Sequence, residues 1–148
     1  MLAVCAGYQI LGTTFCAAGG QVPGLGVLDV ATTPLADRAV GELVAEALDP
    51  MLGMLTGFEN HGGATRLGAG VEPLARVRHG HGNGVGDGTE GVRHGRVVGT
   101  YLHGPALARN PALADLVLGW AVGGAPAPID DSLVERLRAE RFGAVGAR

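Results

Sequence analysis

The chain has 148 residues and a mass of 14.9 kDa, which suits one domain with a sizeable core but not two. Apolar residues make up 47%, charged residues 17%, and the net charge is −3, which excludes a disordered tail and a dense cationic surface for nucleic acid. All 11 basic residues are arginine, which excludes chemistry that needs a catalytic lysine or the lysine of a P-loop.

The first predicted elements are a strand, a sharp turn and a helix. Residues 1–4 form a short apolar run typical of a strand. The small pair Ala6-Gly7 follows Cys5, and apolar side chains then recur at three- and four-residue spacings as far as Cys16, which predicts a helix. At a rise of about 1.5 Å per residue, such a helix would hold the two cysteines roughly 16 Å apart, beyond disulfide reach.

The middle of the chain alternates β-type runs with turns. Strands are predicted at residues 25–30, 40–45, 51–58, 72–78 and 97–101. Between the last two runs lies HGHGNGVGDGTEG, whose Asn-Gly and Asp-Gly pairs predict a hairpin or a mobile loop. The chain has 27 glycines, mostly between apolar runs, and this indicates many tight turns.

Two helices are predicted near the C-terminus. Asn110-Pro111 is typical of a helix start, and that helix is expected to run to about Val122 and to end at a glycine pair. A Pro-rich linker leads to a last helix, from Asp130-Asp131 to about Phe142, whose apolar side suits domain docking or a partner surface. The order of elements indicates the α/β class, with a mixed sheet flanked by helices.

Cys5 and His103 are the candidate catalytic residues. A nucleophile on a strand-to-helix turn is exposed at the edge of a sheet, and the partial positive charge of a helix N-terminus favours the thiolate. The N–H of Ala6 could donate to an oxyanion. His103 ends an apolar strand, where the base of such a site usually lies. The alternatives are a buried structural cysteine and a loop histidine without a role.

Three segments together resemble a known enzyme family. They are CAGYQILG around Cys5, GFENHGG at residues 57–63 and GTYLHGPALARNP at residues 99–111. They are similar to class I glutamine amidotransferases of the cobyric-acid-synthase type, and most similar to the glutaminase subunits of lipid II isoglutaminyl synthases. Residues 1–148 are therefore interpreted as the C-terminal portion of one amidotransferase domain, with a core at about 1–123 and a linker and terminal helix at about 124–148.

The resemblance implies a function for the site. It implies Cys5 as nucleophile, His103 as base and later acid, and Arg38 as the ligand of the glutamine α-carboxylate, whose plane matches a guanidinium fork. No cofactor is expected in this chain. ATP and Mg²⁺ are expected on a Mur-ligase-like synthetase partner, in a heterodimer that amidates D-glutamate of lipid II during peptidoglycan synthesis. A role in corrin synthesis and an inactive binding fragment are the alternatives.

The sequence departs from the family pattern in two places. Relatives carry several βα units before the nucleophile, so the chain is expected to lack N-terminal units and one oxyanion donor, and to be a poor glutaminase alone. Many relatives have glutamate two residues after the histidine, where this chain has Pro105. The third triad carboxylate is then expected from the partner or from Glu59. His61 is interpreted as a strand-end packing residue.

Other kinds of site are weaker candidates. His79, His81, Asp87 and His94 could hold zinc, but the glycine-rich loop offers no fixed scaffold, so no metal site is predicted. The same loop does not open a helix, so a hairpin is predicted there and not a phosphate loop. No bilayer-length apolar run and no signal peptide are visible, and with two free thiols this predicts a cytoplasmic protein without membrane insertion.

Overall fold

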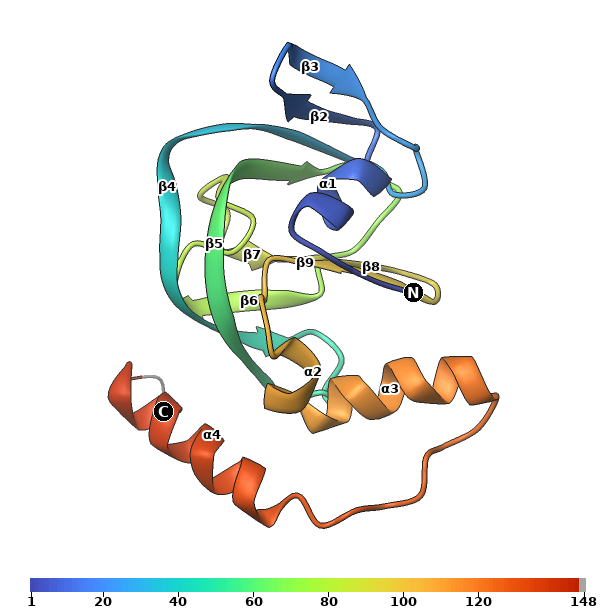
Figure 1. The fold of residues 1–148 in the computed structure, drawn as a ribbon, viewed down its shortest axis with the longest axis vertical. Coiled ribbons are helices and arrows are strands. Elements are labelled where there is room, and N and C mark those ends of the chain that lie inside the picture. The colour runs from blue at the N-terminus through green and yellow to red at the C-terminus, as the bar shows by residue number, and fades with distance from the viewer. Residues whose placement is uncertain (147–148) are drawn as a thin grey trace.

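The strands of the protein form two sheets, and the smaller one carries the candidate nucleophile. The computed structural model describes residues 1–146 (Figure 1). The smaller sheet has the order β1-β9-β8, with β1 (Leu2–Val4) parallel to β9 (Val97–Thr100) and β8 (Val92–His94) antiparallel to β9. The predicted strands at residues 1–4 and 97–101 are thereby confirmed, each one residue shorter at one end.

The larger sheet is built around a long antiparallel hairpin. Strand β4 (Val30–Ala47) pairs with β5 (Met54–Leu67), and both arch across the molecule in Figure 1. The other strands are β2 (Thr14–Ala17), β3 (Gly20–Pro23), β6 (Ala75–His79) and β7 (Thr89–Glu90), in the order β3-β2-β4-β6-β7. The register of the hairpin shifts between Pro34 and Ala39, since proline lacks the N–H that a ladder needs.

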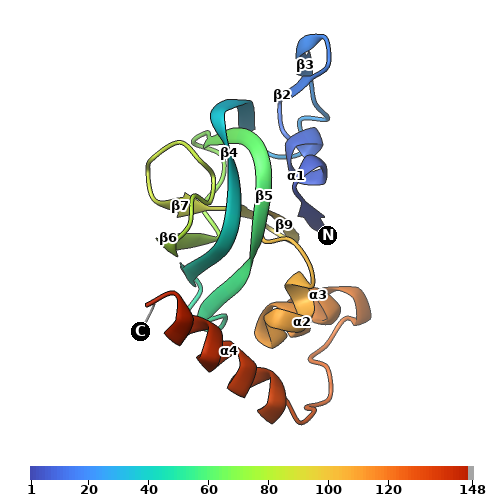
Figure 2. The same ribbon diagram turned by 60° about the vertical axis from the view of Figure 1, so that its left-hand side comes forward.

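The helices lie at the ends of the sheets. Helix α1 (Ala6–Leu11) follows β1, and α2 (Ala106–Arg109), α3 (Pro111–Val122) and α4 (Ser132–Ala144) gather at the opposite end (Figure 2). The predicted mixed α/β class is confirmed. No helix within residues 1–146 is long and apolar enough to cross a membrane. Residues 147–148, which the predicted terminal segment includes, lie outside the described residues.

The prediction of one helix from Tyr8 to Cys16 is wrong. Helix α1 ends at Leu11, and Phe15 and Cys16 lie in β2, which pairs with β3 and with Ala31 of β4. The predicted strand at 25–30 is also wrong except for its last residue. Its N–H groups instead bond the carbonyls at the end of α1, where Leu25 N donates to Ile10 O and Leu28 N to Leu11 O. These residues therefore terminate the first helix.

The other predicted β-type runs are found with different boundaries. The run at 40–45 is part of β4. The run at 51–58 enters β5 only at Met54, since residues 51–53 form the turn before it, and both strands continue well beyond the predicted runs because each supplies the other's ladder. The run at 72–78 begins only at Ala75. The glycine-rich segment returns antiparallel to β6, with Ala75 opposite Glu90, so the predicted hairpin is confirmed.

Helix α3 follows the prediction, but the Asn110 side chain does not cap it. The helix starts at Pro111 and ends before Gly123, which adopts a left-handed φ of 77°. The Asn110 side chain makes no cap bond and is buried instead. Its Oδ1 accepts from Thr56 N at 2.8 Å and its Nδ2 donates to Thr56 O at 2.8 Å. It therefore fastens the start of α3 to β5, which leaves no side-chain group for the cap.

Helix α4 docks through a charged residue and not through its leucines. Arg138 is 8% exposed and donates to Asn110 Oδ1 at 3.0 Å and to Met54 O at 2.6 Å. Leu133 and Leu137 are 57% and 50% exposed. Within the described chain the apolar side of α4 thus faces solvent, because the buried carbonyls of the hairpin need donors that leucine cannot supply.

Candidate active site

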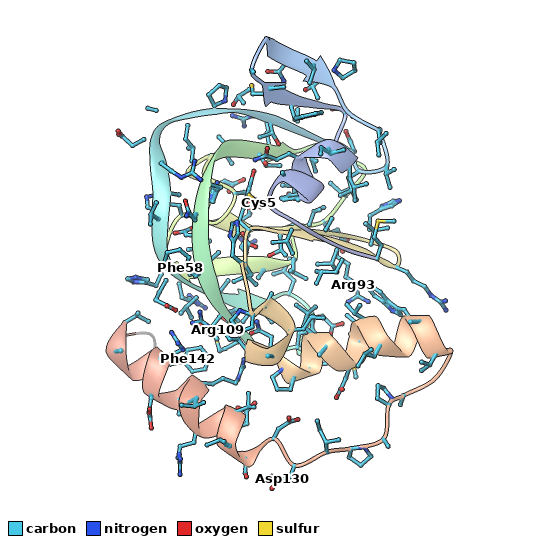
Figure 3. All side chains as sticks on the ribbon, in the orientation of Figure 1. Cys5, Phe58, Arg93, Arg109, Asp130 and Phe142 are labelled. Carbon is cyan, nitrogen blue, oxygen red and sulfur yellow. The ribbon has the colours of Figure 1, made fainter. Side chains whose placement is uncertain are left out.

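Cys5 lies on a sharp turn between strand and helix. Its φ of 53° is the single positive value among non-glycine residues in the described part of the chain. Such strain at the start of a helix is typical of a nucleophile held out from a sheet edge. In Figure 3, Cys5 lies where β1 passes into α1. The N–H of Ala6 is the first of α1, whose leading N–H groups have no partner within the helix.

Adjacent parallel strands carry Cys5 and His103 to the same edge of the small sheet. Val4 is paired with Thr100, and the Cys5 N–H donates to Thr100 O at 2.9 Å. His103 follows three residues later, and its own N–H donates to Phe58 O at 2.8 Å. Both candidate residues thus leave the carboxyl ends of neighbouring strands, which is where α/β proteins place their sites.

A cavity of about 250 Å³ opens beside Cys5 and contains the predicted ligand Arg38. It is lined by side chains from α1, β2, β4 and β5, among them Cys5, Gln9, Cys16, Thr32, Arg38 and His61. The two cysteines share this cavity and both are free thiols. The argument that a continuous helix separates them is therefore wrong, because β2 turns back beside the site.

The guanidinium of Arg38 is oriented by a neighbour that the sequence reasoning missed. Arg38 Nε donates to Asn60 Oδ1 at 2.6 Å, and its Nη2 donates to Asn60 O at 3.3 Å. The Nη1 group takes no part in these bonds. Asn60 belongs to the GFENHGG segment, and the β4–β5 register pairs it with Val40, two residues beyond Arg38, so the Arg38 side chain reaches it diagonally across the hairpin. A fixed, partly unused guanidinium is suited to a carboxylate ligand.

Comparison with known proteins identifies the family. The family model described as a CobB/CobQ-like glutamine amidotransferase domain matches residues 1–111. The chain belongs to this family. The amidotransferase domain is 40% identical to the GatD subunit of lipid II isoglutaminyl synthase from Staphylococcus aureus, over 79% of this chain and 47% of the relative. It is 39% identical to the GatD subunit of Streptococcus pneumoniae, over 77% of this chain and 44% of the relative.

Cobyric acid synthases are also similar to the amidotransferase domain. That of Deinococcus radiodurans is 38% identical over 94% of this chain and 28% of the relative. A crystal structure of a glutamine amidotransferase from Thermotoga maritima covers 97% of this chain and 56% of its own, at 16% identity and a TM-score of 0.47. The chain spans about half the length of the GatD relatives.

The hydrogen bonds of His103 define which ring nitrogen can act as a base in the amidotransferase domain. Its Nδ1 lies 2.8 Å from Tyr101 O and 3.1 Å from Phe58 O. Both contacts are carbonyl oxygens, which only accept, so these contacts select the tautomer of the neutral imidazole that has its proton on Nδ1 and its lone pair on Nε2. No carboxylate among residues 1–146 has a hydrogen bond or ion pair to this ring. Main-chain carbonyls therefore hold the imidazole in the orientation that a triad acid would otherwise fix.

Glu59 is occupied elsewhere and does not contact His103. Its Oε1 accepts from the backbone N of His81 at 2.8 Å, and its Oε2 accepts from Gly82 N at 3.0 Å. Burial raises the pKa of Glu59, but the His61 ring 3.6 Å away and the hydrogen bonds from His81 and Gly82 outweigh it, so the net pKa lies below its ordinary value. The ionised carboxylate thus fixes the turn after β6. It is not the third member of a triad in this chain.

Behind the cavity, Tyr101 is the centre of a buried polar cluster. Its hydroxyl accepts from Gln9 Nε2 at 3.0 Å and lies 2.7 Å from Thr65 Oγ1. The His61 ring stacks on it, with centroids 3.6 Å apart. His61 is predicted to lie at a strand end. It lies instead in the middle of β5. A Cβ on Gly63 would lie 2.4 Å from Gln9 Nε2 and 2.8 Å from Thr32 Cγ2, so a larger residue there would displace these side chains.

Glu90 is the other buried acid of this region. Its side chain is fully buried, its Oε1 accepts from Tyr101 N at 3.0 Å, and its Oε2 has no partner within residues 1–146. Burial raises the pKa of Glu90 to about 7, although hydrogen bonds from Thr100 and Tyr101 oppose that rise. The native fold therefore favours the protonated carboxyl.

Glu90→Gln is expected to flatten the pH dependence of the free energy of unfolding. The pKa of Glu90 rises from 4.5 to about 7 on folding, so its stabilising contribution is complete below pH 4.5 and is lost as the pH passes through about 7. The free energy of unfolding of the wild type should fall by about 3 kcal/mol over this pH window. The Glu90→Gln variant should not show this fall, because glutamine does not titrate. Urea unfolding of both proteins at about pH 5 and about pH 8 measures it. Parallel losses in the two proteins would contradict the burial argument.

Proposed function

We propose that this domain releases ammonia from L-glutamine through a cysteine thioester and passes it to a synthetase that amidates lipid II. The hydrolytic part is supported by two observations: Cys5 and His103 follow the carboxyl ends of the adjacent parallel strands β1 and β9, and Arg38 lies with Cys5 in one cavity, which His103 does not line. The 40% identity to a GatD subunit supports the acceptor. GatD proteins are named as subunits of lipid II isoglutaminyl synthase, and this is the basis for placing the domain in peptidoglycan synthesis.

In the first half-reaction, the Cys5 thiolate attacks the side-chain carboxamide carbon of glutamine. The carbonyl oxygen becomes an oxyanion that the Ala6 N–H, as a leading donor of α1, can stabilise. His103 Nε2, carrying a proton taken from the thiol, donates it to the amide nitrogen. The C–N bond then breaks, ammonia leaves and a glutamyl thioester remains on Cys5.

In the second half-reaction, His103 Nε2 takes a proton from water as the hydroxide adds to the thioester carbon. The tetrahedral adduct collapses, the C–S bond breaks, and glutamate leaves while Cys5 returns to the thiolate. Arg38 binds the α-carboxylate throughout, and this keeps the carboxamide beside the turn. The chain itself needs no cofactor for these steps. A working thiolate suits a reducing compartment, so we place the protein in the cytoplasm.

The proposed partner is a Mur-ligase-like synthetase that binds ATP and Mg²⁺ and forms a heterodimer with this protein. Glutamine labelled with ¹⁵N in its carboxamide tests it. In the assembled complex with lipid II and ATP, the label should appear in the α-carboxamide of the stem-peptide glutamate. Formation of labelled free ammonia without labelled lipid II, in a complex that binds both substrates, would overturn the acceptor and leave the hydrolysis standing.

Corrin amidation is the second candidate. It is favoured by one observation, the 38% identity to a cobyric acid synthase over 94% of this chain, which extends past the region matched by the GatD subunits. The same ¹⁵N-labelled glutamine distinguishes the two acceptors, since a corrin carboxylate would then receive the label in place of lipid II.

Arg38→Met is expected to raise the KM for glutamine by about 10- to 100-fold with little change in kcat. A charge-assisted hydrogen bond contributes about 1.5–3 kcal/mol, and the α-carboxylate does not change during the reaction. Arg136→Met on the exposed side of α4 is the matched control and should leave KM unaltered. Steady-state glutamate release in the assembled complex measures both. An unchanged KM in Arg38→Met would remove Arg38 from the substrate site.

A further inference from the structure

Glu90 joins the two sheets of the protein. It lies in β7 of the larger sheet, opposite Ala75 of β6. Its Oε1 reaches the end of β9 in the smaller sheet, where it accepts hydrogen bonds from Thr100 Oγ1 and from Tyr101 N, the latter at 3.0 Å. Thr100 Oγ1 in turn accepts from Leu102 N at 3.0 Å. One carboxyl oxygen thus fixes three consecutive residues.

Those three residues connect the nucleophile to the base. Thr100 O accepts the Cys5 N–H at 2.9 Å, and Tyr101 O holds His103 Nδ1 at 2.8 Å. Strand β9 ends at Thr100, so Tyr101 and Leu102 have no ladder partner for their N–H groups. Both residues are buried, and a buried N–H without a partner is strongly disfavoured. Glu90 and the hydroxyl that it binds supply the missing acceptors.

The surroundings show why glutamate stands here. The ionisable groups near the Glu90 carboxyl are Glu59, His61 and Tyr8, from β5 and α1. None of them has a hydrogen bond to Thr100 Oγ1 or to Tyr101 N among the described residues. The space beside β9 is also closed to a side chain at position 99, because a Cβ on Gly99 would lie 2.2 Å from the Tyr8 ring. Among the described residues, Glu90 is therefore the side chain that accepts from Tyr101 N and binds the Thr100 hydroxyl, which in turn accepts from Leu102 N.

We propose that Glu90 is a positioning residue, whose Oε1 holds residues 100–102 so that the turn of Cys5 and the imidazole of His103 keep their relative orientation. This rests on the proposed roles of Cys5 and His103. The acceptor oxygen performs the task, so an amide in the same place should largely preserve it. A side chain of similar size without an acceptor should not.

The test compares Glu90→Gln with Glu90→Met in the assembled complex. We expect Glu90→Gln to keep kcat within about 5-fold, and Glu90→Met to lower kcat by about 10- to 100-fold with KM for glutamine within about 3-fold, since Arg38 lies on another strand. Alkylation of Cys5 by iodoacetamide, followed on the Cys5 peptide by mass spectrometry, should slow about 10-fold at neutral pH in Glu90→Met, because the misplaced imidazole no longer supports the thiolate.

Arg138→Met is the control for a general loss of stability. It removes buried hydrogen bonds at the α4 end of the molecule, and should lower Tm without changing the alkylation of Cys5. If Glu90→Met does not fold, Thr100→Val removes the hydroxyl from the same turn and should give the same slowing.

Two results would overturn the proposal. One is a wild-type kcat and a wild-type rate of Cys5 alkylation in Glu90→Met, and the other is an equal loss of kcat in Glu90→Gln and Glu90→Met. The alkylation assay needs no turnover, so it also separates this proposal from the proposed function. If the wild-type complex does not hydrolyse glutamine, the function fails, while the effect of Glu90 on the Cys5 thiol is still measured.

Discussion

Replacement of Cys5 by serine is expected to lower glutaminase turnover by about 10⁴-fold or more. The thiolate is the only group on the strained turn that can form the covalent intermediate, and a serine hydroxyl is not ionised there by a helix N-terminus. The change is small in volume and Cys5 is only partly buried, so the fold should persist. Glutamate release in the assembled complex gives the rate, and thermal unfolding checks that the variant is folded.

Cys16 provides the matched control for this prediction, because it lines the same cavity. Its Sγ lies 3.3 Å from Gln21 Oε1 on a regular strand, with no helix behind it, and we assign it no step of the reaction. Cys16→Ser should therefore retain turnover. An electrophilic glutamine analogue should label Cys5 and not Cys16, as peptide mass spectrometry would show. Labelling at Cys16, or glutamate release by Cys5→Ser above background, would refute the nucleophile assignment.

His103→Ala is expected to lower kcat by about 10²–10⁴-fold, the usual contribution of a positioned acid–base group. The loss arises in both half-reactions, since Nε2 delivers the proton to ammonia and later takes one from water. KM should change little, because Arg38 and not His103 binds the α-carboxylate. Single-turnover measurement of ammonia and glutamate release separates the two half-reactions.

An exposed histidine supplies the comparison for His103. His94, at the end of β8, is exposed and lies on the other side of β9 from the strand that leads to Cys5, so His94→Ala should keep wild-type kcat. Equal loss in both variants, or normal kcat in His103→Ala, would mean that the base is another group. The His103 carbonyl contacts also predict that a partner carboxylate, if it acts, adds to an imidazole whose tautomer is already set.

Much of the site was predictable because its signals are local. The strand, turn and helix around Cys5 follow from an apolar run, two small residues and a periodic segment within a dozen residues. The start and end of α3 follow likewise from Pro111 and Gly123, whose backbone preferences act where they stand. His103 at the end of a strand belongs to the same class of inference.

The failures share a cause, which is pairing between distant segments. Phe15 and Cys16 have helical spacing, yet they lie in β2. The hydrogen bonds that β2 makes with β3 and β4 outweigh the local preference for a helix. Asn110 looks like a cap, but Thr56, 54 positions away, takes both of its side-chain groups. Glu59 is predicted as a possible triad acid, but backbone N–H groups of the turn after β6 occupy its oxygens.

The sequence alone determined which reactive groups are present, a cysteine at a turn and a histidine after a strand, whereas Arg38 was implied only by the resemblance to the family. Only the tertiary structure decided their relations. Asn60 orients the Arg38 guanidinium, main-chain carbonyls accept the hydrogen bond from His103 Nδ1, and Glu90 Oε1 holds the residues between the end of β9 and His103. The physical reason is that residue type and backbone preference act over a few residues. Buried hydrogen bonds are instead satisfied by whatever group the fold brings near, at any distance along the chain.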